Sequence, residues 1–189
     1  MYSEQFRKYE ELLRKWQKKI NLVSANTLPQ LHARHFADSL QLADLIPKDA
    51  KIIDLGSGAG FPGAVLAIAG FNVTCVESDQ RKAAFLSELK QQLNLQNLTI
   101  ANERAENFIE TLSGTNHIFT ARAFAPLIKI LDMTAPAKSR LFLLKGRDLD
   151  AEISEAETKY KLNYNIINSK TSDGKIIIIN DSQPLFHMK

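Results

Sequence analysis

The chain has 189 residues, 44% of them hydrophobic and 24% charged, which is the balance of a globular protein with room for one domain. Its single cysteine, Cys75, excludes an internal disulfide framework, and no apolar run approaches the ~20 residues that span a bilayer. A net charge of +3 permits a nucleic-acid partner without requiring one. The N-terminus lacks the apolar core of a signal peptide, so we expect a cytoplasmic protein with no membrane partner.

Residues 1–20 have the pattern of an amphipathic helix. Apolar side chains recur there at steps of three and four residues, which places them in one stripe along a helix. The stripe consists of Phe6, Tyr9, Leu13, Trp16 and Ile20. The cations around it are Arg7, Lys8, Arg14, Lys15, Lys18 and Lys19. Two interpretations stay open: the solvated face of a docked helix, and a face that contacts RNA phosphates.

A second helical region is predicted after a break at residues 21–27. Thr27 is placed to cap a helix that runs to about Leu45, because its side chain can accept from the first free N–H groups. His32 and His35 lie three residues apart in this region, a spacing that suits a metal pair. No other histidine or cysteine lies near them in the sequence, so we expect no metal and assign both side chains to packing, capping or a substrate pocket.

Residues 51–63, KIIDLGSGAGFPG, are the most informative stretch. An apolar run that ends in alternate glycines is typical of a parallel strand that turns sharply into a helix, here over residues 61–68. The N–H groups at the start of that helix would point at a ligand on the turn. Phe61 breaks the dinucleotide fingerprint G-x-G-x-x-G/A, because it stands where a small residue is needed. The acid-x-Gly-x-Gly-x-Gly pattern from Asp54 to Gly60 is instead typical of S-adenosylmethionine-dependent methyltransferases.

A second acid supports a nucleoside site. Glu77 ends the next apolar run and follows Gly58 by about 20 positions, which is where a ribose-binding carboxylate belongs. A glycine pattern alone is weak evidence, since tight turns are common. The combination of strand, glycine turn, helix and acid makes the nucleoside site the better interpretation.

From residue 51 onward, predicted strands and helices alternate, which predicts an α/β fold with a doubly wound parallel sheet. The expected strands are 51–55, 72–77, 98–102, 117–123 and 140–144, and the expected helices are 80–93, a short one from Arg104, and 150–161. Residues 164–168 and 175–180 flank an Asp-Gly turn and predict a hairpin. A parallel sheet that ends in an antiparallel hairpin is typical of a class I methyltransferase. We expect a helical cap over 1–48 and a methyltransferase domain over 49–189, forming one compact unit.

Ligands of such sheets bind at the carboxyl ends of the strands. We expect the glycine turn to hold the methionyl part of the cofactor, Glu77 its ribose and Ala105-Glu106 its adenine. Glu106 has an alternative role as a first-turn acid that the helix dipole favours. Arg122, at the end of a central strand, needs a partner, either the methionyl carboxylate or a substrate phosphate. The expected cofactor-binding residues are Asp54, Gly56, Ser57, Gly58, Gly60, Phe61, Glu77, Ser78, Ala105, Glu106 and Arg122.

Absent motifs narrow the methyl acceptor. Methylation of an exocyclic amine usually accompanies an Asn/Asp-Pro-Pro-aromatic motif after the fourth strand, where this chain has Arg122-Ala-Phe-Ala-Pro126. Methylation of pyrimidine C5 needs a cysteine nucleophile, whereas Cys75 lies within a predicted buried strand. An acceptor with its own lone pair, such as guanine N7, needs no general base and only has to be aligned.

Six motifs occur together and in order, and the chain thereby resembles the bacterial 16S rRNA guanine-N7 methyltransferase family RsmG, also called glucose-inhibited division protein B. They are NLVS (21–24), RHFADSL (34–40), DLGSGAGFPG (54–63), RAE (104–106), ARAFAPL (121–127) and LLKG (143–146). The resemblance covers nearly the whole chain. It implies that Gly56, Phe61, Ala105, Glu106 and Arg122 contact S-adenosylmethionine, and that Arg34, His35 and Lys145 line the acceptor side. It also implies that the acceptor is a guanine in the decoding region of 16S rRNA.

The resulting hypothesis is a monomeric methyltransferase that acts on rRNA, and not on DNA, by direct in-line displacement. The rRNA substrate is either free or part of the small ribosomal subunit or its assembly intermediate. The residues expected to act at the reaction centre are Arg122, Lys145, Arg34 and His35. Two alternatives remain: a small-molecule methyltransferase, and a non-catalytic ribosome-binding factor that keeps the cofactor as a ligand. A nicotinamide oxidoreductase is the weakest alternative, because Phe61 breaks its fingerprint.

Overall fold

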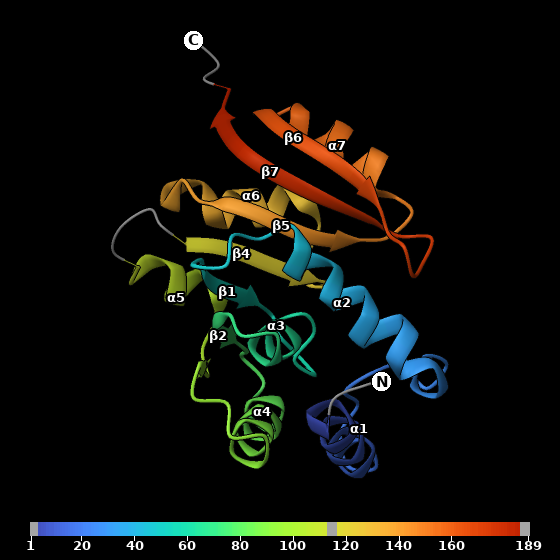
Figure 1. Ribbon diagram of the computed structural model, residues 1–189. Coiled ribbons are helices and arrows are strands. Elements are labelled where there is room, and N and C mark those ends of the chain that lie inside the picture. The colour runs from blue at the N-terminus through green and yellow to red at the C-terminus, as the bar shows by residue number, and fades with distance from the viewer. Residues whose placement is uncertain (1–3, 113–116, 186–189) are drawn as a thin grey trace.

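The computed structural model describes residues 4–112 and 117–185, and a seven-stranded sheet runs through its centre (Figure 1). The strand order is β3-β2-β1-β4-β5-β7-β6. The first five strands along the chain pair in parallel, whereas β7 is antiparallel to β5 and β6. The strands are β1 (Lys51–Leu55), β2 (Asn72–Val76), β3 (Leu98–Ala101), β4 (His117–Arg122), β5 (Arg140–Lys145), β6 (Tyr160–Asn168) and β7 (Lys175–Pro184). The predicted parallel sheet with an antiparallel hairpin at its end is confirmed.

Helices cover both faces of the sheet (Figure 1). On one face lie α1 (Glu4–Gln17), a helical run over residues 28–44, α3 (Gly63–Ile68) and α4 (Gln80–Gln92). On the other lie α5 (Ala105–Glu110), α6 (Leu127–Thr134), the short η4 (Ala135–Ala137) and α7 (Leu149–Glu157). Successive strand residues face opposite sides, so Ile52 packs in the first core and Ile53 in the second. Such a sheet is buried on both faces, which explains its continuous apolar strands.

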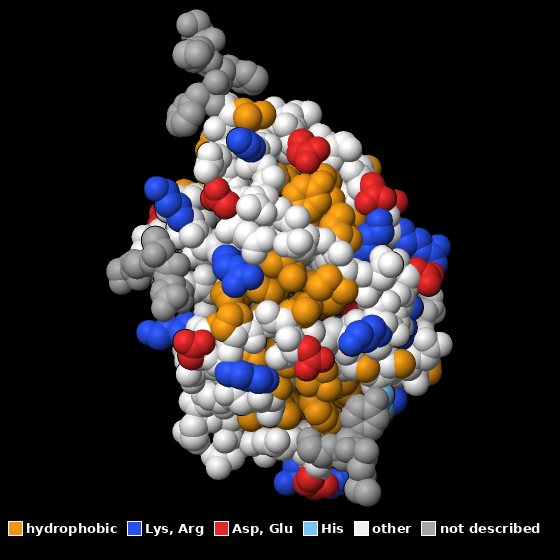
Figure 2. Space-filling model, turned by 45° about the horizontal axis from the view of Figure 1, so that its top comes forward, with side chains coloured by type: hydrophobic (Ala, Val, Ile, Leu, Met, Phe, Trp, Pro, Cys, Tyr) orange, Lys and Arg blue, Asp and Glu red, His pale blue; other side chains and the backbone are white. Residues whose placement is uncertain are grey.

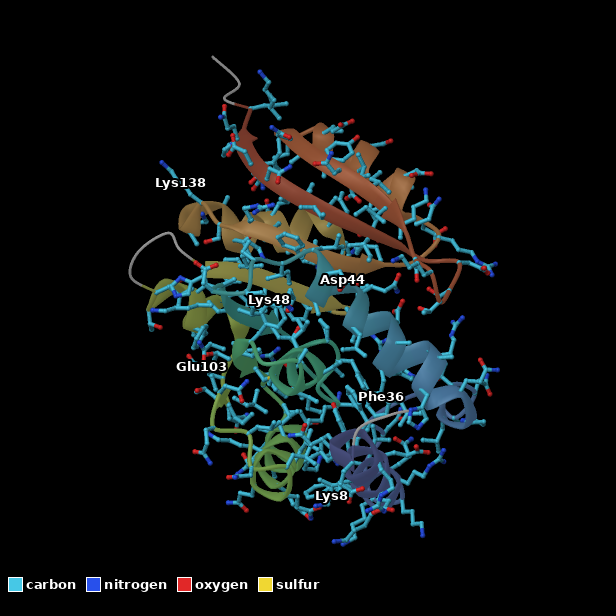
Figure 3. All side chains as sticks on the ribbon, in the orientation of Figure 1. Lys8, Phe36, Asp44, Lys48, Glu103 and Lys138 are labelled. Carbon is cyan, nitrogen blue, oxygen red and sulfur yellow. The ribbon has the colours of Figure 1, made fainter. Side chains whose placement is uncertain are left out.

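The predicted N-terminal helix is confirmed as α1, and the first three residues of that prediction lie outside the described residues. Tyr9 is fully buried, stacks on Phe61 with ring centroids 5.5 Å apart, and donates its hydroxyl to the Ala59 carbonyl at 2.5 Å. Figure 3 shows Phe36 on the helical run that faces α1, and its ring centroid lies 5.0 Å from that of Tyr9. The N-terminal cap and the sheet therefore share one core.

The cations of α1 are largely matched with acids. The ion pairs are Arg7 with Glu4 and Glu11, Lys8 with Glu4, Arg14 with Glu10, and Lys15 with Glu88. Figure 2 likewise shows cationic and acidic side chains interspersed over the face that it draws. A helix face with paired charges presents little net field to an RNA. The structure therefore favours the solvated, docked helix of the two interpretations.

The second helical region differs from the regular helix that we predicted. It consists of η1 (Leu28–Gln30), η2 (His32–Ala37), α2 (Asp38–Leu40) and η3 (Gln41–Asp44), where η1 and η3 are 3₁₀ turns and η2 is a π-helix. The capping prediction for Thr27 is wrong, because its side chain makes no cap bond and instead contacts the Ser24 carbonyl and the His35 ring. Wide π turns are frequent at functional sites, and this one carries Arg34 and His35.

Other boundaries also differ. α3 begins at Gly63 and not at residue 61, because Phe61 and Pro62 still belong to the turn. The predicted helix over 150–161 ends at Glu157, since Tyr160 already begins β6. β6 and β7 pair from the turn as far as Tyr160 opposite Pro184, so the hairpin is longer at both strands than predicted.

The helix α6 was not predicted. Its buried residues nevertheless recur at the three- and four-residue steps of a helix. They are Leu127, Ile130, Leu131 and Thr134. Pro126 directly before them is a common helix start, so the pattern was available in the sequence.

Candidate active site

Three glycines shape the turn after β1. Gly56, Gly58 and Gly60 have φ angles of +64°, +55° and +89°, which other residues rarely adopt. A Cβ at Gly60 would lie 2.4 Å from the Tyr9 hydroxyl, whereas one at Gly58 would meet only the Gly56 carbonyl, at 3.8 Å. The backbone at Gly58 therefore faces open space, which fits the close approach of a ligand such as S-adenosylmethionine.

Asp54 lies beneath this turn and is completely buried. One oxygen accepts from the Gly63 N–H at 3.1 Å and the other from the Thr120 hydroxyl at 2.9 Å. Burial raises the pKa of Asp54 to about 6, against the opposing effect of the hydrogen bonds around it. The N–H group that opens α3 is thus directed at Asp54 and not toward a ligand, contrary to our expectation. Ser57 is also buried and donates to the Asp54 carbonyl, so both residues brace the turn from below.

Glu77 lies beside the turn at the end of β2. Its carboxylate accepts from the Gly58 N–H and from the Asp79 N–H, both at 2.8 Å. These bonds hold the carboxylate at the carboxyl edge of the sheet. A carboxylate has about four acceptor positions, so two remain for the hydroxyls of a ribose.

The other residues expected at the nucleoside lie at the same edge. Ser78 is exposed directly after Glu77. Ala105 is buried at the start of α5, and Glu106 is exposed in the first turn of that helix. Because β2 and β3 are neighbours, the start of α5 lies next to Glu77 along this edge. Both roles proposed for Glu106, an adenine contact and a dipole-favoured acid, are compatible with this position.

A cavity of about 600 Å³ opens next to the glycine turn, at the carboxyl ends of β4 and β5. The structure brings the residues predicted for the reaction centre to this one cavity: Arg34 and His35 from η2, Arg122 from β4 and Lys145 from β5. Its volume falls within the ~300–1,000 Å³ of small-molecule sites.

Arg122 is held by partners on several sides. Its guanidinium donates to the Arg34 carbonyl at 3.0 Å and to the His35 ring, and it lies 3.6 Å from the Asp38 carboxylate. It also lies over the Phe61 ring, 5.1 Å from the centroid. Burial lowers the pKa of Arg122 from its usual value, and the charge of Asp38 opposes that shift. We expected the methionyl carboxylate or a substrate phosphate as the partner of this cation, whereas the carboxylate that the structure places next to it is that of Asp38.

His35 is a neutral hydrogen-bonding group. A guanidinium can only donate, so Nδ1 of His35 accepts from Arg122 and the protonated Nε2 donates to the Thr27 hydroxyl at 2.9 Å. Burial first, and then the charges of Arg122 and Arg34, lower the pKa of His35 to about 3. His35 therefore stays uncharged at neutral pH and serves to orient Arg122.

Most cations of the cavity are paired with carboxylates. The pairs are Arg122 with Asp38, Lys145 with Glu152, Arg147 with Asp173, and Lys175 with Asp150. Lys145 lies 2.5 Å from Glu152 and also donates to the Ala125 carbonyl at 3.0 Å. Within residues 4–112 and 117–185, no carboxylate lies at ion-pair distance from Arg34, whose side chain is exposed. Arg34 is therefore the cavity cation whose charge is available to an outside anion.

Phe124 lies where the glycine turn and the cavity adjoin, and sequence reasoning missed it. A Cβ at Gly56 would lie 2.2 Å from the Phe124 ring, so the ring rests directly on that glycine while it also lines the cavity. Ala123 before it has a φ of +52°, a strained conformation that sets the direction of the chain here. The sequence analysis also missed Asp38 and Glu152, and it predicted the Asp-Gly hairpin turn without assigning it to the site. An aromatic residue directly after a strand end was a usable signal for Phe124, but no sequence pattern pairs Glu152 with Lys145.

Neither a metal cluster nor a membrane-spanning helix is found among the described residues. In the ranges 4–112 and 117–185, no group of three or more histidine, cysteine, aspartate or glutamate side chains could hold a metal ion. His32 hydrogen-bonds to Glu10 at 2.5 Å, whereas His35 contacts Thr27 and Arg122, so the two histidines do not converge. None of the helices in this part of the chain has the length and apolar character needed to cross a membrane.

Several solved structures with a similar fold carry the name of a methyltransferase. The chain aligns with a putative O-methyltransferase from Klebsiella pneumoniae with a TM-score of 0.65 and 14% identity, covering 95% of this chain and 90% of that one. It aligns with a SAM-dependent methyltransferase from Aquifex aeolicus with a TM-score of 0.61 and 13% identity, covering 80% and 92%. A mutant of MtNAS in complex with S-adenosylmethionine gives a TM-score of 0.64 at 13% identity, covering 94% and 71%. The strand order, the glycine turn and these likenesses define the class I S-adenosylmethionine-dependent methyltransferase fold.

Sequence comparison gives the particular family. The family described as "GidB: rRNA small subunit methyltransferase G" matches residues 2–175. Ribosomal RNA small subunit methyltransferase G of Gluconobacter oxydans is 44% identical over 180 residues, 93% of this chain and 91% of the relative. The protein of that name from Rickettsia prowazekii is 41% identical over 178 residues, 92% and 91% of the two chains. The chain belongs to the rRNA small subunit methyltransferase G family, as the six motifs predicted.

Proposed function

We propose that this protein transfers the methyl group of S-adenosylmethionine to N7 of a guanine in the decoding region of 16S rRNA, with the guanine seated in the cavity beside the glycine turn. The observation that carries the proposal is the balance of charge in that cavity. A guanine methylated at N7 becomes a cation, so a wall of uncompensated cations would oppose the reaction. Carboxylates pair with most cations of this cavity, and they leave it able to tolerate the positive charge that develops on the base.

The chain's own groups suit an acceptor that needs alignment and no deprotonation. Guanine N7 carries a free lone pair, so the reaction does not require a general base. The histidine nearest the reaction centre, His35, is neutral and already engaged at both ring nitrogens. Neither His35 nor the paired Lys145 needs to move a proton in this mechanism.

The cofactor supplies the electrophilic methyl group. We expect the backbone of Gly56–Gly60 to hold its methionyl part, the Glu77 carboxylate its ribose and the Ala105-Glu106 segment its adenine. Phe124, which rests on Gly56 and lines the cavity, would stack on the guanine and keep its plane beside the cofactor. Stacking of a base on an aromatic ring contributes about 1–3 kcal/mol. The protein then acts by excluding water and aligning nitrogen, methyl carbon and sulfur.

The partner in this proposal is 16S rRNA, within the small ribosomal subunit or its assembly intermediate, in the cytoplasm, and the protein acts as a monomer. Arg34 is placed for the first contact with such a polyanion, because its exposed guanidinium has no carboxylate partner among the described residues. We expect it to bind a phosphate next to the target guanine.

The proposal is tested with radiolabelled S-adenosylmethionine and small-subunit rRNA that lacks the modification, both free and assembled into particles. The expected result is label at one guanine, where reduction followed by aniline treatment cleaves the strand as it does at 7-methylguanosine. Cofactor binding without label on either form of RNA would contradict the proposal. That result would favour the ribosome-binding factor, and methylation of small molecules alone would favour the other alternative.

Replacement of Arg34 by glutamine should weaken RNA binding and make the affinity less dependent on salt concentration. Each phosphate contact contributes about one unit to the slope of log K against log [salt], so the variant should lose about one unit of slope. The measurement is the affinity for small-subunit rRNA between about 50 and 200 mM salt. Lys138→Gln is the control for the loss of an exposed charge. Lys138 is exposed and precedes the amino end of β5, whereas the cavity lies at the carboxyl end of that strand (Figure 3). Equal slopes for Arg34→Gln and the wild-type protein would exclude Arg34 as a phosphate contact.

A further inference from the structure

Asp38 is a buried carboxylate between the cavity and two segments that are distant in sequence. It lies on α2 with 7% of its surface exposed. Its Oδ2 lies 3.6 Å from Nη1 of Arg122, which makes it the carboxylate partner of that arginine. A buried carboxylate is costly unless it is paired and hydrogen-bonded. The partners that satisfy each oxygen of the Asp38 carboxylate therefore indicate its role in the site.

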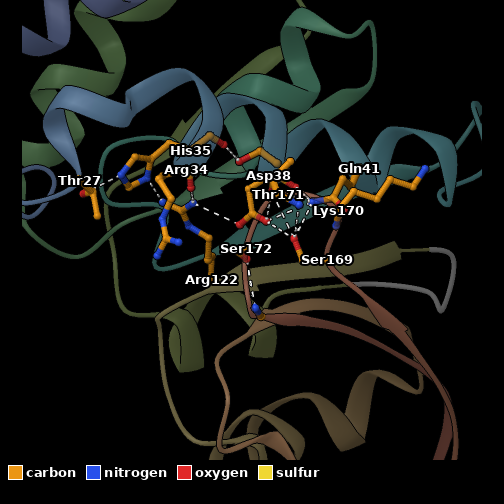
Figure 4. Close-up of polar contacts among 12 residues, drawn as sticks. Thr27, Arg34, His35, Asp38, Gln41, Arg122, Ser169, Lys170, Thr171 and Ser172 are labelled. Carbon is orange, nitrogen blue, oxygen red and sulfur yellow. Dashed lines mark hydrogen bonds and ion pairs between the residues drawn. The ribbon is translucent and has the colours of Figure 1, made fainter.

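The other oxygen of Asp38 holds the turn between β6 and β7. Oδ1 accepts from the hydroxyls of Ser169 and Thr171, each at 2.9 Å, and from the side-chain amide of Gln41 at 3.1 Å. Gln41 adds a bond of its own by accepting from the Lys170 N–H at 2.7 Å. Figure 4 shows Asp38 at the centre of these contacts, with Arg122 on one side and the turn on the other.

The turn that Asp38 holds forms one wall of the cavity. Ser169 and Gly174 line it, and the turn packs tightly on the end of β5. A Cβ at Gly174 would lie 2.7 Å from the Lys145 carbonyl, so only glycine permits this contact. This turn therefore contacts the end of β5 at Gly174 and the Asp38 carboxylate at Ser169, and the same carboxylate pairs with Arg122.

We infer that Asp38 is a positioning residue for methyl transfer, which sets the Arg122 guanidinium with one oxygen and the wall at 169–171 with the other. This rests on the proposed function, because the cavity must receive the acceptor base. The acceptor capacity of Asp38 is already used by Arg122, Ser169, Thr171 and Gln41. Asp38 thus acts through Arg122 and the turn, and it makes no contact with the guanine.

Two sets of variants separate the tasks of the two oxygens. Asp38→Asn keeps an oxygen for Ser169 and Thr171 but turns an amide without charge toward Arg122. The double change Ser169→Ala with Thr171→Val removes the two hydroxyl donors and leaves the charge next to Arg122. We expect Asp38→Asn to lower kcat about tenfold, whereas the loosened wall of the double variant should mainly raise KM for the RNA, by about fivefold.

A double-mutant cycle distinguishes positioning from mere support of the fold. Asp38→Asn in an Arg122→Gln background should lower kcat by less than about twofold, because the group through which Asp38 acts is already gone. Asp44→Asn is the matched control, since Asp44 is an exposed aspartate on the adjacent η3. Melting temperatures of all variants, measured alongside, identify any that fail to fold.

Two outcomes would overturn the inference: a kcat for Asp38→Asn close to that of the wild-type protein, or a full tenfold further loss in the Arg122→Gln background. The same assays include the wild-type protein on small-subunit rRNA. Absence of label with the wild-type protein would instead be a failure of the proposed function, so the two failures are distinguishable.

Discussion

Replacement of Arg122 by glutamine is expected to slow methyl transfer about a hundredfold or more, because a displacement of about 1 Å in the groups around a reaction centre has a cost of that size. Arg122 is the cation on which the site converges: it contacts the Arg34 carbonyl, the His35 ring and Asp38, and lies over Phe61. Glutamine has neither the charge nor the planar fork that make these contacts together. The measurement is single-turnover methylation of small-subunit rRNA at saturating cofactor.

The controls for Arg122 separate charge, geometry and stability. Arg122→Lys keeps the charge but has a point-like head group, so we expect an intermediate rate. Arg140→Gln makes the glutamine change at an exposed arginine at the opposite end of the sheet, where the rate should match the wild-type protein. Arg122→Gln also leaves Oδ2 of the buried Asp38 without its ion-pair partner, while Ser169, Thr171 and Gln41 still donate to Oδ1, so the melting temperature should fall. A rate for Arg122→Gln within about twofold of wild type would remove it from the site.

The sequence predicts those parts of the fold that depend on local patterns, namely hydrophobic periodicity and the residues of tight turns. Alternating strands and helices, the glycine turn and the Asp-Gly hairpin are local patterns, and each matches the structure. The same reasoning failed over residues 28–44, because a helix period does not distinguish regular α turns from the 3₁₀ and π turns that tertiary contacts impose. Thr27 is a good cap by composition, but a buried ring, that of His35, competes for its hydroxyl.

The site was predictable as a set of residues and not as a set of contacts. Strand ends and motifs indicated Arg34, His35, Arg122 and Lys145, and the fold brings all four to one cavity. Their partners come from segments far along the chain, as Glu152 does for Lys145. No spacing rule in a single sequence records such pairs. The position of an aspartate such as Asp38, which joins the N-terminal segment to the last hairpin, follows only from the tertiary structure.

Replacement of Glu77 by glutamine should lower the affinity for S-adenosylmethionine about a hundredfold or more. The Glu77 carboxylate accepts from the N–H groups of Gly58 and Asp79. In glutamine one acceptor becomes an NH₂ group that would face an N–H, so the bond to the turn or the bond to Asp79 is lost. The ribose that we propose to bind at Glu77 would also lose an ionised acceptor, and hydrogen bonds to a charged group contribute about 1.5–3 kcal/mol each. Calorimetric titration with the cofactor, in the absence of RNA, measures the loss directly.

The Glu77 result also tests whether the glycine turn and the acceptor cavity are separate sites. Arg122→Gln at the cavity should change turnover more than cofactor affinity, whereas Glu77→Gln should change affinity first and regain part of its rate at high cofactor concentration. Glu110→Gln, at an exposed glutamate at the far end of α5, is the matched control for the loss of a charge. Normal cofactor affinity in Glu77→Gln would mean that this carboxylate only braces Gly58, and the ribose contact would then have to be sought elsewhere along the edge formed by β2 and β3.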